Sequence, residues 1–148
     1  MKIEAKFYSE KNQLYFLDGS KAELNSEKIK AYDVKWTEVG LDEDSYNEEF
    51  LANLREQFKA LEENGTYGFV VPVCDSACQT EEQKENLVAS FKHCARRIKD
   101  CENIIGFAIP SEADSAYFME ELSAKHKHYI YFTKDQNLSK SNEKIVKF

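Results

Sequence analysis

The first part of the chain alternates between apolar and polar positions in the way that is typical of β-strands. Residues 3–7 alternate strictly, which is the pattern of a strand with one buried face. A second strand is predicted at residues 14–17 after a polar turn, and the Asp18-Gly19 pair that follows it is a strong hairpin signal. A third apolar run covers residues 29–39. These residues predict a β-hairpin followed by a further strand.

A helical period begins after this region. Apolar side chains recur at helical spacing through residues 46–61. Asp42 and Asp44 suit the start of that helix, because acidic side chains accept hydrogen bonds from its first free N–H groups. Asn64-Gly65 suits its end, where a left-handed residue is common. The pattern therefore predicts a helix between these two signals.

Two further pairs of strand and helix follow. Residues 67–73 and 104–109 are continuous apolar runs of strand length, as expected for strands that are buried on both faces. Residues 80–83, of sequence Thr-Glu-Glu-Gln, form a capping box that begins the intervening helix. Residues 111–114 are interpreted as a second capping box, which begins a third helix. Residues 129–132 are expected to form a short strand.

The order of these elements predicts an α/β fold whose sheet is mainly parallel and is preceded by a β-hairpin. A β-α-β-α-β-α-β alternation implies right-handed crossovers, with helices packed on the sheet. We expect one domain, with a hairpin extension at residues 1–27, the α/β unit at 28–135 and a tail at 136–148. A final edge strand is predicted at residues 144–148, beyond a polar loop.

Composition and charge exclude several classes of function. No apolar run approaches the length that crosses a bilayer, and the N-terminus lacks the apolar core of a signal peptide, so a cytoplasmic, non-membrane protein is expected. The net charge of −7 argues against nucleic acid as a partner. Gly-rich phosphate loops are absent from the sequence, and no cofactor is expected.

The cysteines and histidines offer weaker candidates. The four cysteines are expected to be free thiols, with Cys94 in the core. Cys74 and Cys78 are spaced for metal or redox chemistry, but no second pair completes a zinc site, and no metal is expected. His126 and His128 alternate with lysines and are interpreted as the solvated end of a helix.

Three stretches of the sequence resemble cellulase-type glycoside hydrolases. Residues 97–100 (Arg-Ile-Lys-Asp) and 103–107 (Asn-Ile-Ile-Gly-Phe) resemble the end of the third helix and the fourth strand of that family. Residues 61–67 (Leu-Glu-Glu-Asn-Gly-Thr-Tyr) resemble the entry into its third strand. The resemblance covers about residues 30–133 and implies a half TIM-barrel-like fold.

The resemblance also implies a site. Glu112 falls where the family keeps its acid/base glutamate, while Ser111 replaces the asparagine that holds the sugar 2-hydroxyl, and Ala113 replaces a proline. Residues 73–75 (Val-Cys-Asp) replace an aspartate and histidine motif. The nucleophile of the family belongs to a seventh strand, and these 148 residues reach about the fifth.

Hydrolysis needs a second carboxylate, about 5–5.5 Å from the acid for retention or about 6.5–9.5 Å for inversion. Glu38, Asp75 and Asp135 are candidates, because each follows a predicted strand and would share an edge of the sheet with Glu112. Trp36 is a candidate for stacking on a sugar ring, with burial in the core as the alternative.

These observations predict a glycoside-hydrolase-like domain that is catalytically inactive and acts by binding or assembly. The alternative is a glycosidase in which Glu112 is the general acid/base and an in-chain or partner-supplied carboxylate assists. The expected partners are a carbohydrate, or a second copy of the chain that pairs through an open edge of the sheet to form a homodimer.

Overall fold

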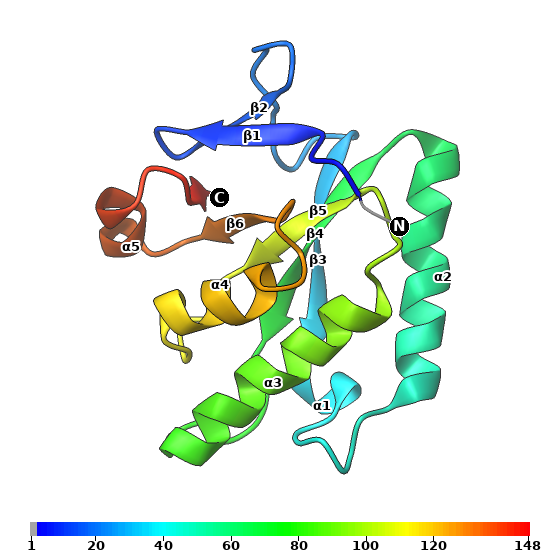
Figure 1. Ribbon diagram of the computed structural model, residues 1–148, viewed down its shortest axis with the longest axis vertical. Helices are drawn as coiled ribbons and strands as arrows, with labels where there is room; N and C mark the ends of the chain where they lie inside the picture. The colour runs from blue at the N-terminus through cyan, green and yellow to red at the C-terminus, as the bar shows by residue number, and fades with distance from the viewer. Residues whose placement is uncertain (1–2) are drawn as a thin grey trace.

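The computed structural model describes residues 3–148, which form a parallel sheet flanked by helices and an N-terminal hairpin (Figure 1). The strands are β1 (Phe7–Glu10), β2 (Gln13–Phe16), β3 (Ile29–Lys35), β4 (Tyr67–Val73), β5 (Ile104–Ala108), β6 (Ile130–Thr133) and β7 (Val146–Lys147). The helices are α1 (Trp36–Val39), α2 (Glu48–Asn64), α3 (Glu81–Arg97), α4 (Ser115–Ser123) and α5 (Gln136–Ser141). The predicted fold class is confirmed.

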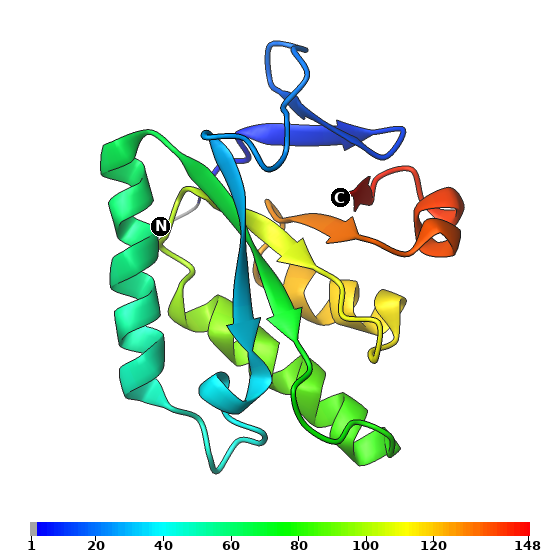
Figure 2. The same cartoon turned by 180° about the vertical axis from the view of Figure 1, so that it is seen from behind.

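The five strands of the main sheet lie in the order β3-β4-β5-β6-β7, and each neighbouring pair is parallel. Because this order never reverses, right-handed crossovers place the connecting helices on the same face. Figures 1 and 2 show α3 and α4 together on one face of the sheet. In a (β/α)₈ barrel the helices likewise form an outer ring around consecutive parallel strands.

The face toward the helices carries the larger apolar core. Phe58 of α2, Phe91 of α3 and Phe118 of α4 are fully buried against Val70 and Phe107 of the sheet. Burial of each such side chain contributes roughly 1.5–3 kcal/mol to folding. The helical stripes predicted from the sequence are therefore the surfaces that hold α2, α3 and α4 on the sheet.

The opposite face of the sheet has its own aromatic core. Phe69 of β4 and Phe132 of β6 are stacked, with ring centroids 3.9 Å apart, and Phe148 packs edge-on against Phe69 at 5.2 Å. Phe7 and Leu14 of the hairpin are buried in the same cluster. The hairpin and the last residues therefore cover the face that would point into the interior of a barrel.

The hairpin is anchored to the C-terminal segment by Asn12. Its side-chain nitrogen lies within hydrogen-bonding distance of three carbonyl oxygens, those of Ser139 (2.7 Å), Asn142 (3.0 Å) and Ile145 (2.6 Å). Its backbone N–H donates to the carbonyl of Glu143 at 2.7 Å. Figure 1 shows the hairpin beside the C-terminal segment, and Ser9, whose hydroxyl donates to the carbonyl of Lys144 at 2.5 Å, joins the two as well.

Strand β5 approaches β6 closely at Gly106. A Cβ atom at this position would lie 1.7 Å from the carbonyl oxygen of Ile130 in β6. Any larger residue would have to displace the backbone of the neighbouring strand. The glycine within residues 103–107, one of the stretches that resembles the glycoside hydrolases, is therefore required by packing.

The hairpin turn lies at Lys11 and Asn12, in the polar turn predicted before residues 14–17. Both residues have left-handed backbones, with φ of 51° and 64°, as a two-residue hairpin turn requires. The predicted turn at residues 18–19 forms next and leads to a single bridge between Tyr15 and Lys21. This turn ends β2 at Phe16, so its partner strand starts at Phe7 and not at residue 3.

The apolar run at residues 29–39 is not one strand. β3 ends at Lys35, and the single turn of α1 buries Trp36 and Val39 before Gly40, whose φ of 124° turns the chain away. The apolar pattern continues across this boundary, so it could not indicate the change of structure.

The start of α2 was predicted too early. Asn47 caps the helix by accepting a hydrogen bond from the N–H of Phe50 at 3.0 Å. Asp42 instead accepts from the N–H of Asp44 in the preceding turn. The predicted end at Gly65 and the capping box at Thr80 are confirmed.

The C-terminal region contains a helix that the sequence pattern did not predict. α5 occupies most of the expected polar loop, and Asp135 caps it. The predicted edge strand is confirmed in shortened form as β7, which pairs in parallel with β6. Over the part of the chain that the structure describes, no helix is both long and apolar enough to span a membrane.

We predict that Asn12→Gly lowers the free energy of unfolding by about 1–3 kcal/mol, because three carbonyl groups lose a donor while the left-handed backbone is still accommodated. Urea denaturation measures the change. Lys11→Gly is the matched control, since it alters the neighbouring left-handed residue and removes an exposed side chain. Equal stability of the two variants would contradict the anchoring role of Asn12.

Candidate functional site

The predicted site lies at the edge of the sheet where the parallel strands end. Glu38 lies in α1 after β3, while Asp75, Glu112 and Asp135 follow β4, β5 and β6. Parallel strands bring these connections to one edge of the sheet, which is where open α/β sheets bind ligands. Local hydrogen bonds decide what each carboxylate can do there.

Asp75 is bonded to the start of α1. Its two carboxylate oxygens accept hydrogen bonds from the backbone N–H of Thr37 at 3.0 Å and from the Thr37 hydroxyl at 2.5 Å. Desolvation alone would raise the pKa of Asp75, but the bonds from Thr37 outweigh it, and the pKa lies below its ordinary value. Asp75 is therefore an ionised group that joins the connection after β4 to the one after β3.

Asp135 has a structural role as well. One of its oxygens accepts from the N–H of Asn137 at 2.8 Å and from that of Leu138 at 3.2 Å, which caps α5. A carboxylate in this position satisfies backbone donors at the helix start. Like Asp75, it already accepts hydrogen bonds from the chain itself.

Glu112 is exposed and lies in a turn, not in a helix. The N–H of Ala113 donates to the carbonyl of Pro110 at 3.1 Å, which closes a turn through residues 110–113. Asp114 alone caps α4, by accepting from the N–H of Tyr117 at 2.9 Å. The predicted capping box at residues 111–114 is therefore wrong.

Glu112 lies close to the connection that follows β4. The pKa of Cys74 is raised to about 11, mainly by burial and further by the nearby Cys78 and Glu112. Glu38 and Ser111 are exposed at the same edge. Among residues 3–148, no two of the four candidate carboxylates share a hydrogen-bond donor, and Ser111 donates no side-chain hydrogen bond.

Trp36 is not available to a sugar. It is only 2% exposed, and its indole N–H donates to the hydroxyl of Ser90 on α3 at 3.1 Å. That hydroxyl donates in turn to the carbonyl of Gly40 at 2.7 Å. The indole ring thus connects α1 to α3 through its hydrogen bond to Ser90. Of the two predicted roles of Trp36, burial in the core is therefore correct, and the stacking role is wrong.

All four cysteines are free thiols, as predicted. Cys94 and Cys101 are buried, and burial raises the pKa of each to about 12. Cys74 and Cys78 are half-buried. Within the described range, 3–148, no three His, Cys, Asp or Glu side chains converge in a way that could hold a metal ion.

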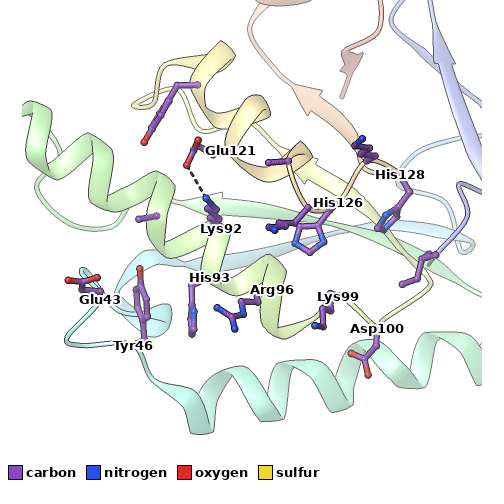
Figure 3. A pocket seen from close by; sticks show the side chains of 16 residues that line it. Glu43, Tyr46, Lys92, His93, Arg96, Lys99, Asp100, Glu121, His126 and His128 are labelled. Atoms are coloured by element: carbon purple, nitrogen blue, oxygen red, sulfur yellow. Dashed lines mark hydrogen bonds and ion pairs between the residues drawn. The ribbon is translucent and has the colours of Figure 1, made fainter. Parts of the chain in front are cut away.

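A different surface contains a groove of about 1160 Å³ beside α3. We call it the α3 groove. It runs along α3 from Glu43 and Tyr46, at the connection before α2, to His126 and His128, at the connection before β6 (Figure 3). Glu38, Asp75, Glu112 and Asp135 are not among the residues that line it.

The prediction that His126 and His128 form a solvated helix end is wrong. His126 is 6% exposed and His128 is half-buried, because both rings pack around Tyr129, with centroids 5.1 and 4.5 Å from it. Burial lowers the pKa of both imidazoles, that of His126 to about 4, with a further contribution from the charge of Lys99. The alternation of His and Lys at residues 125–128 was the available signal for this groove.

No family model matches the sequence, and no curated protein matches it significantly. Solved structures are similar in fold. A GH5_18 protein from Bifidobacterium longum subsp. longum, in complex with Manβ1-4GlcNAc, superposes with a TM-score of 0.50 and 10% sequence identity, over 72% of this chain and 34% of that chain. A GH5_18 protein from Bifidobacterium longum subsp. infantis matches over the same shares, with 10% identity and a TM-score of 0.47.

The fold is similar to part of the α/β barrel of the GH5_18 protein with the TM-score of 0.50. The resemblance predicted from the sequence is thus confirmed for the fold, and the aligned region covers 34% of that protein's chain. At this level of identity the likeness extends to the fold and not to the chemistry. The function must therefore be argued from the residues of this chain.

We predict that Thr37→Val raises the pKa of Asp75 toward its ordinary value, because the carboxylate loses one of its two donors. A carboxylate whose folded pKa is lowered stabilises the fold above its unfolded pKa of about 3.9, and this contribution is lost as the pH falls through the folded value. The variant should therefore be less stable than the parent at neutral pH and should approach it in acid.

NMR titration of the side-chain carboxyl carbon measures the pKa of Asp75, and urea denaturation at both pH values measures stability. Thr66→Val is the matched control, because it makes the same substitution at the other end of the sheet. If the pKa of Asp75 is equal in both variants, the Thr37 hydroxyl does not lower that pKa, and the prediction is refuted.

Proposed function

We propose that the protein is a glycoside-hydrolase-like domain that acts by binding and does not hydrolyse glycosides. The observation that carries this proposal is that two of the three carboxylates expected to assist Glu112 already accept hydrogen bonds from the chain. Asp75 accepts from Thr37, and Asp135 caps α5. Hydrolysis requires two carboxyl groups placed on either side of the glycosidic bond, so these bonds weaken both candidates.

The covering of the sheet supports the same proposal. Phe7, Leu14 and Phe148 pack on the face that would point into a barrel, where Phe69 and Phe132 are stacked. Trp36 is fixed in the core by Ser90. The described residues thus use their aromatic side chains for packing at positions where a sugar-binding cleft would expose them.

A glycosidase remains the second candidate, and the exposure of Glu112 beside Cys74 favours it. In that function Glu112 would be the general acid/base, and Glu38, which is also exposed, or a carboxylate supplied by a partner would assist it. A carbohydrate is then the natural ligand class. The complex of one GH5_18 protein with Manβ1-4GlcNAc makes that disaccharide a suitable probe.

We predict no turnover of aryl glycosides or of Manβ1-4GlcNAc, and the same result for Glu112→Gln. Release of nitrophenol and of reducing sugar is the measurement. Glu120→Gln, at an exposed position of α4, is the matched control. Turnover that is lost in Glu112→Gln and kept in Glu120→Gln would overturn the proposal and establish the glycosidase.

Pairing of two copies is a second form of binding that one feature favours. β3 is the first strand of the sheet and the longest together with β4, and over residues 3–148 its outer edge pairs with no other strand. Seven residues of unpaired edge, roughly 23 Å long, offer a template for a second β3. Two copies related by a two-fold axis would satisfy both edges.

We predict that the mass measured by light scattering rises toward that of a dimer as the concentration increases. The amides of β3 should gain protection from hydrogen exchange over the same range, while those of β6, inside the sheet, should stay unchanged. A constant monomeric mass at all concentrations would exclude this pairing.

A further inference from the structure

The α3 groove gathers positive charge on an acidic protein. Arg96 of α3 and Lys99, in the turn after that helix, line it together with Lys125 and Lys127, and none of the four forms an ion pair within residues 3–148. The chain as a whole carries a net charge of −7. Four cations without ion pairs therefore lie together in one groove, although the molecule as a whole is negatively charged.

The acidic groups of the groove do not neutralise these cations. The carboxylate of Asp100 accepts a hydrogen bond at 3.0 Å from Nε of Arg55, which is not one of these four cations. Glu121 forms an ion pair with Lys92 at 3.0 Å. Figure 3 shows Glu43 at the end of the groove away from His128, with Arg96 and Lys99 between them. The groove is thus polarised, with its excess positive charge toward the histidines.

Two imidazoles lie at the positive end. His126 and His128 are in contact with Tyr129, and the Nε2 atom of His128 is buried without a hydrogen-bond partner in the described part of the chain. An anion placed here would lie beside fixed cations and the two imidazole rings. The cations repel one another when the groove is empty, and a negative ligand would relieve that repulsion.

The shape of the groove indicates an extended ligand. The α3 groove follows the helix and the residues after it from Ala89 to Asp100, which is about 16 Å at the helical rise. An extended peptide covers that distance with about five residues. Its volume of about 1160 Å³ is far larger than a single phosphate or acetate fills.

We propose that the α3 groove binds a short, extended, acidic segment of a partner protein, with its carboxylates beside Arg96, Lys99 and the two lysines that flank His126. Arg96 suits a carboxylate because its guanidinium presents two parallel donors. Tyr46, stacked on His93 at 4.3 Å, and the exposed Tyr117 offer apolar surface to the rest of the segment.

A peptide fits better than a nucleic acid. Double-stranded DNA carries one negative charge per about 1.7 Å, and its charge continues beyond any groove of this length. The net charge of −7 on the chain would repel that continuation, as would Glu43 at the far end of the groove. A peptide can confine its acidic residues to the positive end.

The test is fluorescence anisotropy with a fluorescein-labelled glutamate pentapeptide, at low and at physiological ionic strength. We expect binding to the intact chain that weakens with salt, because charge attraction carries it. In Lys125→Glu/Lys127→Glu the affinity should fall about tenfold or more. The matched control is Lys28→Glu/Lys140→Glu, which changes the net charge equally at exposed sites outside the groove.

A second measurement reports on the histidines. Peptide carboxylates beside His126 and His128 should raise the pKa of both imidazoles in NMR titrations, so the peptide should bind more tightly as the pH falls below neutral. The groups around these rings are His128 and His126 themselves, Tyr129, Lys99, Glu102, Lys125 and Lys127, with Glu4 and Lys6 from the N-terminal segment.

Several results of these measurements would overturn the proposal. Equal affinity of the groove and control variants would overturn the proposal, as would unchanged pKa values of both histidines in the bound state. Inorganic phosphate or a single strand of DNA binding as tightly as the peptide would also overturn it, by showing a site for any anion. Because Glu112 does not line the groove, peptide binding and glycoside turnover are tested independently.

Discussion

A parallel sheet must be covered on both faces, and in this protein a different kind of structure covers each one. Helices α2, α3 and α4 pack on one face, as consecutive right-handed crossovers require. The other face is closed by aromatic stacking, in which Phe69 and Phe132 form the floor and the hairpin and Phe148 lie over it. This aromatic core lets barrel-like strands exist in a five-stranded sheet, and it fills the space that a complete barrel would enclose.

The sequence predicted the helix face well because that face depends on local patterns. A few neighbouring residues are enough to specify each of its features, namely the apolar stripes through Phe58 and Phe91, the capping box at Thr80 and the left-handed Gly65. The errors occur where distant contacts decide the structure. Asn12 anchors the hairpin through carbonyl groups more than 120 residues away, and no local signal encodes those partners.

In the candidate site, too, local patterns were predicted and distant contacts were not. The sequence placed four carboxylates at the correct edge, since each one follows a strand. It could not reveal that Thr37 bonds Asp75, or that an unpredicted helix takes Asp135 as its cap. The α3 groove was missed for a related reason. Its charges come from α3 and from the connection before β6, and each group alone resembles an ordinary solvated helix end.

The anchor at Asn12 has a consequence for the order in which the chain folds. Strands β3 to β6 and their helices connect neighbours in sequence, so they can assemble as soon as each crossover is available. The contact from Asn12 to Ile145 spans 133 residues and closes only after residue 145 has been made. Such long closures are slow to form. During synthesis the aromatic face of the sheet is therefore uncovered until residues 145–148 are available to pack on it, which makes this stage the one at which a nascent chain would most need protection from aggregation.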